Sequence, residues 1–373
     1  LALLRARASG RWWDISGDLG ITLLVTREYE HLALSLGIER GRPKTRLLRL
    51  PHPSGIAADP ARGEVHIACT RNPNAILTLR PAEGLEDRED VAAFDPGRPL
   101  MPALTRHLPG SVYLHDLAMI GGVLHANSVG SNAVVRVGRE GGAAPAWWPA
   151  CIDRPEGPAF GRNYLQLNSI AAGETLETSF FTASADRISA RRPGHRNFPV
   201  DRRGVLFSGA TREPAARGLT RPHSARVAGG AVWLDDSGYG TAGPVVDGRY
   251  EPAARLPGWT RGLAAAGPYL VVGTSRVIPR FRQYAPGLDV DRSACGLHLL
   301  HRASGEIHGS LTWSEGNQIF AIEALPASWT CGFPFAAPRA RGAPSDRERL
   351  TFYAWRAGAP ADPSCAINED PSQ

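Results

Sequence analysis

The chain has 373 residues, including 41 glycines and 31 prolines, and a formal net charge of +6. Its hydrophobic fraction of 43% supports a large core and argues against global disorder. No apolar run approaches the roughly 18 residues of a membrane span. So many turn formers break long helices and favour short strands joined by turns. The length allows one or two domains.

The positive charge does not indicate a nucleic-acid partner. Lys44 is the only lysine, so almost all of the 42 basic residues are arginine. Acidic residues are scattered among these arginines, and no basic run is interleaved with aromatic residues. We therefore expect neither nucleic-acid binding nor membrane association.

The cysteines and the first residues bear on the cellular compartment. Five cysteines without CxxC spacing fit neither a zinc knuckle nor a disulfide framework, although bridges Cys295–Cys331 or Cys331–Cys365 stay open. The apolar start precedes the first arginines, the reverse of the order in a secretory signal. We expect reduced thiols and a cytoplasmic protein.

Short strands follow one another along the whole chain. Residues 21–26, 31–37 and 45–51 read as three strands that lack an inner partner. After them, one pattern recurs five times: an apolar strand, a tight turn, a second strand, then Ser or Thr. These hairpins occupy 54–70, 115–128, 168–184, 223–237 and 261–275. Further apolar stretches follow most of them, as at 75–80, 132–138 and 243–248.

Repeated four-stranded antiparallel units indicate an all-β fold, the β-propeller. If 318–325 supplies the inner strand for 21–51, the ring closes at six blades and no sheet edge stays open. The alternative is seven blades, with added strands such as 350–355. We expect an N-terminal extension at 1–19, a propeller at 20–335 and a tail rich in proline, alanine and arginine at 336–373.

The register of the repeat places polar residues at one mouth of the channel. Two positions before each first-strand anchor stand Ser54, His115, Asn168, His223 and Arg261, and the sixth blade offers Asn317 or Gln318. A buried polar cluster is costly unless it is satisfied. The residues either plug the channel by bonding one another or converge on a ligand. In the second case Ser54, Asn168, Arg261 and Gln318 would bind substrate.

The imidazoles offer two kinds of chemistry. His115 and His223 could act as general acid and base, with Asp116 orienting or charge-stabilising an imidazole, although neighbours on a strand point opposite ways. Arg261 could clamp a carboxylate or phosphate. Alternatively, His115 and His223 could hold a divalent transition metal such as Zn, Cu, Ni or Fe. No Gly-rich loop precedes a helix, so we expect no nucleotide cofactor.

Several strings together resemble an uncharacterised bacterial family. They are YLHDLA (113–118), LNSIA (167–171), RPHSAR (221–226), VWLDDSGYG (232–240), LPGWTRGLA (256–264) and NQIFAIEALP (317–326). The resemblance implies a six-bladed propeller distantly similar to NHL-repeat, gluconolactonase-like and strictosidine-synthase-like proteins, and it carries no activity. The family's usual Gln-Glu-Ile-Phe-Asp reads Asn-Gln-Ile-Phe-Ala at 317–321, which removes both acids.

Two functions remain open at this stage. The leading hypothesis is a tailoring enzyme, a hydrolase or an isomerase or epimerase, that acts on a polar small molecule or peptide at the channel mouth. The alternative is a non-catalytic scaffold that binds a protein or ligand on the propeller faces, since fold does not decide function.

Overall fold

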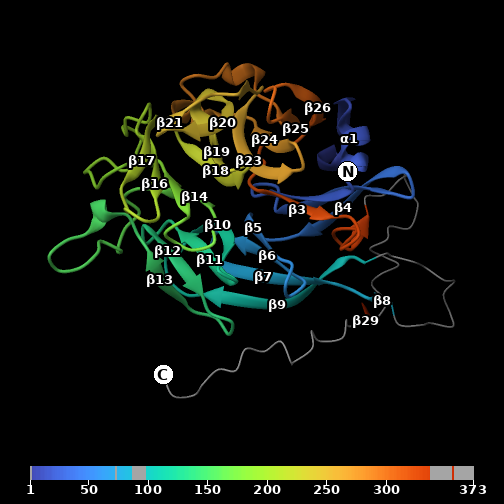
Figure 1. The fold of residues 1–373 in the computed structure, drawn as a ribbon, viewed down its shortest axis with the longest axis horizontal. Coiled ribbons are helices and arrows are strands. Elements are labelled where there is room, and N and C mark those ends of the chain that lie inside the picture. Colours follow the sequence, from blue (N-terminus) through green and yellow to red (C-terminus); the bar gives the residue numbers. More distant parts are fainter. Residues whose placement is uncertain (1, 72–73, 86–97, 337–354, 357–373) are drawn as a thin grey trace.

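The computed structural model describes residues 2–71, 74–85, 98–336 and 355–356, and six antiparallel sheets stand around a central axis in it (Figure 1). The innermost strands, β27, β5, β10, β14, β18 and β23, contact one another in that order and close into a ring. The six-bladed β-propeller predicted from the repeat is confirmed.

The strands of each blade run from the axis outward. They are β5 (Pro53–Asp59), β6 (Glu64–Cys69), β7 (Asn74–Pro81) and β9 (Leu100–Leu108); β10 (Leu114–Ile120), β11 (Val123–Ser128), β12 (Ala133–Val137) and β13 (Ala143–Trp147); β14 (Leu167–Ala171), β15 (Phe180–Ala183), β16 (Gly204–Ser208) and β17 (Pro214–Leu219); β18 (Pro222–Ala228), β19 (Ala231–Asp236), β20 (Thr241–Val246) and β21 (Arg249–Tyr250), with β22 (Ala254–Arg255) also on β20; β23 (Trp259–Ala266), β24 (Tyr269–Ser275), β25 (Cys295–His301), β26 (Ile307–Trp313) and β1 (Ala6–Gly10); and β27 (Ile322–Pro326), β2 (Ile21–Arg27), β3 (Leu32–Glu39), β4 (Arg42–Arg49) and β28 (Phe335–Ala336).

Helical segments are short, as the turn-rich composition predicts. They are α1 (Trp12–Asp18) and the 3-10 turns η1 (Ala2–Leu4), η2 (Ala150–Ile152), η3 (Ser237–Tyr239), η4 (Pro279–Tyr284) and η5 (Val290–Arg292). None of the helices in the described part of the chain has the length and apolarity that a membrane crossing requires. Cys69, Cys151 and Cys295 are free thiols, so the bridge Cys295–Cys331 is not formed, and Cys365 lies outside the described residues.

Glycine pairs explain the tightest hairpins. Gly121 and Gly122 join β10 to β11 with φ of 57° and 74°, and Gly229 and Gly230 join β18 to β19 with φ of 59° and 80°. Two successive positive φ angles make a turn whose twist matches that of the flanking strands, and glycine adopts them without a Cβ clash.

The chain ends close the ring at two seams. β27 pairs with β2 in antiparallel register, with Val25 opposite Ile322, which confirms the predicted closure by the inner strand. The segment expected as an N-terminal extension at 1–19 packs on the preceding blade: β1 adds to the outer edge of β26, and Trp12 of α1 is fully buried. Both seams cover edges that would otherwise be open to pairing.

The residues that might add a seventh blade do not form one where the structure describes them. β29 (Trp355–Arg356) pairs only with β8 (Gly84–Leu85), in a two-stranded ribbon apart from the six sheets. The other residues of the proposed strand at 350–355, and most of the expected tail at 336–373, lie outside the described residues.

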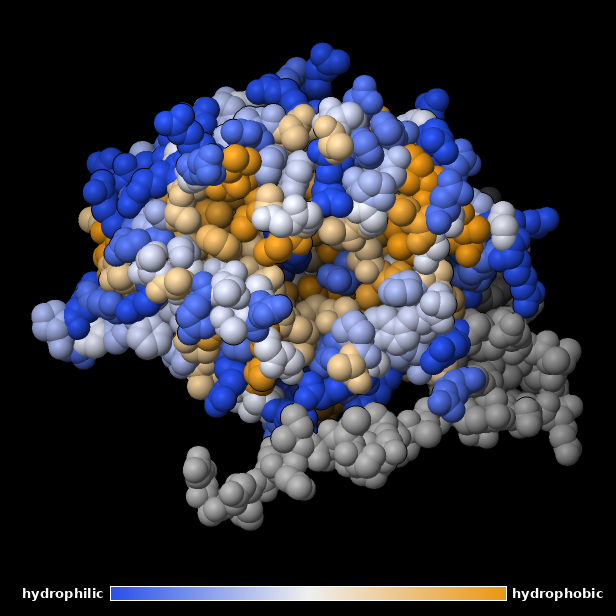
Figure 2. Space-filling view, in the orientation of Figure 1, coloured by the Kyte–Doolittle hydropathy of each residue, from blue (hydrophilic) through white to orange (hydrophobic). Residues whose placement is uncertain are grey.

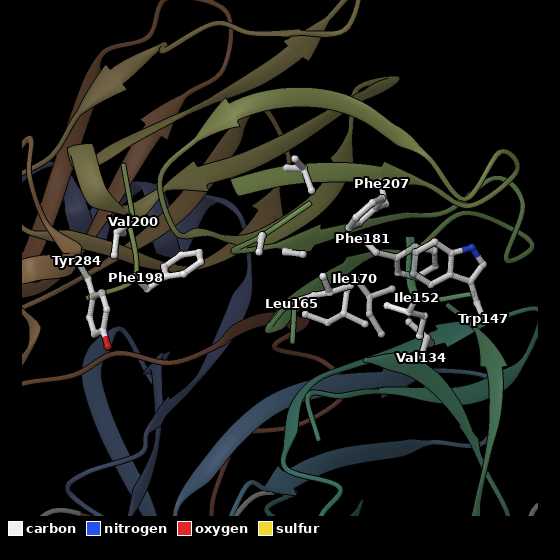
Figure 3. Close-up of a cluster of buried hydrophobic side chains, with 14 of the residues drawn as sticks. Val134, Trp147, Ile152, Leu165, Ile170, Phe181, Phe198, Val200, Phe207 and Tyr284 are labelled. Carbon is white, nitrogen blue, oxygen red and sulfur yellow. The ribbon is translucent and has the colours of Figure 1, made fainter. Parts of the chain in front are cut away.

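An apolar cluster packs the blades of β10 and β14 against the neighbouring loops. Trp147 packs against Phe181 with ring centroids 4.0 Å apart, and Ile152 and Leu165 belong to the same cluster (Figure 3). The cluster extends to Tyr284 in η4, near Phe198 and Val200 in Figure 3. Burial of these side chains anchors the long loops that connect the outer strands.

Candidate functional site

Five of the six inner strands share an irregularity close to their first residues. Register shifts occur between Pro53 and Ile56, Leu114 and Leu117, Leu167 and Ser169, His223 and Arg226, and Thr260 and Leu263. A β-bulge bends its strand and re-aims a side chain, and bulges are frequent beside active sites. Five of the polar residues found by register lie in or beside these bulges, and Gln318 precedes the sixth inner strand, β27. We call Ser54, His115, Asn168, His223, Arg261 and Gln318 the inner ring.

A cavity of about 540 Å³ opens at this end of the channel. Four members of the inner ring line it: His115, Asn168, His223 and Arg261. Figure 2 shows that the face of the molecule is hollowed near its centre. The repeat therefore brings together side chains that are up to 146 residues apart in the sequence.

Arg261 links the two imidazoles. Its Nε donates to Nε2 of His223 at 3.1 Å, and one Nη lies 3.5 Å from Nε2 of His115. Phe320 lies under this group, with the guanidinium carbon 3.8 Å from its ring centroid. The imidazole rings are 5.3 Å apart between centroids. These contacts hold three functional groups at one wall of the cavity.

The contacts assign the proton on His223. Because Nε2 accepts from Arg261, Nδ1 carries the hydrogen and donates to Oγ of Ser224 at 2.9 Å. In His115, by contrast, Nδ1 is buried without a hydrogen-bond partner among the described residues. Burial, followed by the positive charge of Arg261, lowers the pKa of both histidines well below the usual range. Both imidazoles are therefore neutral at pH 7.

The other predicted binding residues have different surroundings. Asn168 lines the cavity while its Nδ2 donates to Oγ of Ser184 and to the carbonyl of Pro222 on the next blade. Ser54 is not among the lining residues, and its hydroxyl lies 3.2 Å from the carbonyls of Ala68 and Leu114.

Gln318 acts through Arg261 rather than through the cavity wall. In the amide orientation that satisfies its neighbours, its oxygen accepts from Arg261 at 2.5 Å and its nitrogen donates to Glu28 at 3.3 Å. The amide therefore connects the guanidinium to a carboxylate.

Asp116 is not brought to the imidazoles. Its carboxylate binds Arg226 through two contacts, of 2.8 and 3.2 Å, and accepts from the backbone N–H groups of Leu117 and Ile170. Neighbouring residues of a strand point to opposite faces, so His115 lines the cavity while Asp116 turns toward Arg226. The expected pairing of Asp116 with an imidazole is absent.

A second set of residues lies outside the register used for the inner ring. Two residues before the inner ring stand His52, Tyr113, Gln166, Arg221 and Trp259, which we call the outer ring. All but His52 line the cavity. The first four have positive φ, between 46° and 56°, although none is glycine. Such strain persists only where the surrounding structure imposes it, and it is frequent at functional sites. The register used for the inner ring, extended two residues earlier, could have found this set.

The cavity wall is strongly cationic. The lining arginines are Arg71, Arg192, Arg221, Arg261 and Arg280, and the one lining carboxylate is Glu28. Glu28 accepts from Nε of Arg71 at 3.0 Å. Most of the arginine charge therefore faces the cavity without an adjacent carboxylate.

The predicted metal site at the histidines has an unfavourable neighbour. A metal ion would need a free ring nitrogen from each imidazole, yet the guanidinium of Arg261 contacts Nε2 of both. Its positive charge would also repel a cation. The donor set around His115 and His223 therefore does not fit a divalent metal.

Another group could hold a metal ion. Among the described residues, ligand atoms of Asp59, Glu64 and His66 lie within 4.8 Å of one another, at the β5–β6 hairpin. Their carboxylates pair with Arg62 and Arg80. None of the three lines the cavity, so this group has no evident part in its chemistry.

Solved structures show the same fold at low sequence identity. A chain from a nidogen/laminin complex is 12% identical, with a TM-score of 0.55, and the match covers 84% of this chain and 100% of that one. A protein of unknown function from Bacteroides caccae is 11% identical, with a TM-score of 0.50 and coverage of 82% and 99%. A gluconolactonase from Xanthomonas campestris is 12% identical, with a TM-score of 0.45 and coverage of 71% and 77%.

These likenesses concern the architecture of the propeller alone. No curated protein matches the sequence. A family defined as a domain of unknown function, DUF4915, matches residues 10–332, which include all six inner strands and both polar rings. The chain belongs to this DUF4915 family.

Proposed function

We propose that this propeller is an enzyme that hydrolyses or isomerises a small polar molecule in the cavity, with His115 transferring the proton. The observation that carries the proposal is the neutral imidazole of His115, which lines the cavity and whose Nε2 lies 3.5 Å from the guanidinium of Arg261. A neutral imidazole can accept a proton, and a fixed cation can stabilise the negative charge that then develops.

His223 has a supporting part in this proposal. Its two ring nitrogens are already engaged by Arg261 and Ser224, so it holds the guanidinium in place. In isomerisation, His115 would take a proton from a carbon beside a carbonyl, Arg261 would face the enolate oxygen, and the proton would return to carbon. In hydrolysis, His115 would take the proton of an attacking water and pass it to the leaving group.

The test is turnover of a defined panel in D₂O. The panel contains hydroxy acids, lactones, sugar phosphates and matched neutral sugars, and mass spectrometry reads the recovered compounds. Isomerisation places deuterium on carbon, and hydrolysis adds the elements of water. We expect His115→Gln to lower the rate by about 100-fold or more, the usual contribution of general base catalysis.

His107→Gln is the matched control, because His107 is exposed on β9 and does not line the cavity. It should keep the native rate. Equal rates for native protein and His115→Gln would contradict the role of His115. Binding of panel compounds without any turnover would favour the non-catalytic alternative.

A further inference from the structure

Arg221 is a buried cation without a carboxylate partner among the described residues. Its side chain lines the cavity and the residue is 8% exposed. One Nη donates to Oε1 of Gln166 at 3.0 Å, and the guanidinium carbon lies 4.4 Å from the ring centroid of Tyr284. Burial, together with the like charge of Arg261, lowers the pKa of Arg221 to about 10. Even so, it stays charged at pH 7.

Arg261 is a second buried cation in the same cavity without a bonded carboxylate among the described residues. It is 6% exposed, and its close partners are the uncharged groups His223, Gln318 and Phe320. The nearby carboxylate, Glu28, already binds Arg71. An ion removed from water without a bonded counter-ion is costly, and an oxyanion supplied from outside would offset that cost.

Other residues of the cavity wall also favour the binding of an anion. Arg192 and Arg280 line the entrance, where Arg280 is exposed and lies 4.9 Å from the ring centroid of Tyr29. Cationic walls around a cleft raise the local concentration of anions. Uncharged polar side chains, among them Gln166 and Asn168, also line the cavity.

We infer that the substrate of this cavity carries a carboxylate or phosphate oxyanion, which is bound between Arg221 and Arg261. The planar fork of a guanidinium matches either group through paired N–H donors. The amides and the phenol of Tyr113 suit hydroxyl groups on the rest of the molecule. This inference rests on the proposed function, since it names the class of substrate for the same cavity.

Calorimetric titration of the full chain tests the inference without requiring turnover. The probes are inorganic phosphate, tartrate as a hydroxy dicarboxylate, and glucose as the neutral comparison, all at one ionic strength. We expect at least one anion to bind and glucose not to bind. Arg221→Gln and Arg261→Gln should each weaken anion binding by about tenfold to a hundredfold, the range for hydrogen bonds to a charged group.

Two further variants show whether a loss is specific. Arg221→Lys keeps the charge but not the fork, so its affinity should fall between those of the native protein and Arg221→Gln. Arg249→Gln removes the same charge from an exposed position on β21 and should bind like the native protein. Circular dichroism of each variant confirms that it is folded.

The outcomes distinguish a phosphate from a carboxylate ligand, and they distinguish failure of the anion site from failure of the enzymatic function. Binding of phosphate alone identifies a phosphate ester, and binding of tartrate alone identifies a carboxylic acid. If neither anion binds, or if Arg221→Gln and Arg261→Gln bind as tightly as Arg249→Gln, the inference is overturned while turnover of a neutral substrate can still stand. Anion binding without turnover of any panel compound would uphold the anion site and favour the non-catalytic alternative over the enzyme.

Discussion

Two groups of buried or half-buried charges lie on or beside the inner strands, and they differ in how the charge is balanced. At the cavity, the guanidiniums of Arg221 and Arg261 have no directly bonded carboxylate among the described residues. In the other group, the side chain of Arg226 binds both carboxylate oxygens of Asp116. Adjacent residues of β10, His115 and Asp116, contribute to the two groups separately.

The sequence around Arg226 suits a structural role. Three residues after each member of the inner ring, five positions carry alanine and the one on β18 carries Arg226: Ala57, Ala118, Ala171, Arg226, Ala264 and Ala321. The side chain of Arg226 is long where the equivalent residues are alanine, and it reaches Asp116 two blades away. A charge that is paired within the chain therefore links blades, whereas a buried charge without an internal counter-ion is available to bind a ligand.

The largest effect is expected from breaking the balanced pair. Arg226→Met leaves the carboxylate of Asp116 buried without its cation, which costs about 3–5 kcal/mol of unfolding free energy. Urea unfolding measures this loss. Phosphate binding at the cavity should persist in the folded variant. A change of less than about 1 kcal/mol would contradict the structural role of the pair.

A pH-dependent effect is expected at Glu323, whose carboxyl lies in the field of Arg226 and Asp116. Burial raises its pKa to about 7, partly offset by Arg226. The folded state therefore holds this proton more tightly than the unfolded state, so its stabilising contribution is present at low pH and is lost as the pH rises toward 7 and above.

Glu323→Gln removes this titration. The variant should match the native stability near pH 5 and exceed it at pH 8 by roughly 1–3 kcal/mol. Denaturant unfolding of both proteins across this pH range gives the difference. Parallel pH profiles would show that Glu323 does not titrate in this way.

A smaller effect is expected at Ser54, the inner-ring residue that does not line the cavity. Ser54→Ala removes one hydroxyl donor shared between two carbonyls and should cost about 1 kcal/mol of unfolding free energy. Its affinity for anions should equal that of the native protein. A tenfold weaker affinity would restore Ser54 as a binding residue.

The smallest effect on stability is expected at Arg221, with the opposite sign to Arg226. Arg221→Gln removes a buried cation that has no carboxylate, so the ligand-free variant should be as stable as the native protein or more stable by up to about 1 kcal/mol. Thermal unfolding without added anion measures this. A loss of several kcal/mol would mean that Arg221 is a structural residue.

Period-two alternation and turn residues were sufficient to predict the ring of blades and its closure from the sequence. The same register identified four lining residues, because pseudo-equivalent positions face a common axis. It did not identify Arg226 as the partner of Asp116, because Arg226 lies on β18, two blades away from β10. Gln166 and Arg221 were missed because they precede the apolar runs, and Arg280 comes from η4, which belongs to no repeat.

The central claim is that Arg221 belongs to a ligand site and Arg226 to the framework. The direct test is thermal unfolding of Arg221→Gln and Arg226→Met with and without the anion that binds the native protein, at constant ionic strength. The account predicts that Arg226→Met melts lower but is stabilised by the anion, whereas Arg221→Gln melts at or above the native temperature and gains no anion stabilisation. The reverse pattern, or equal anion stabilisation of both variants, would contradict it.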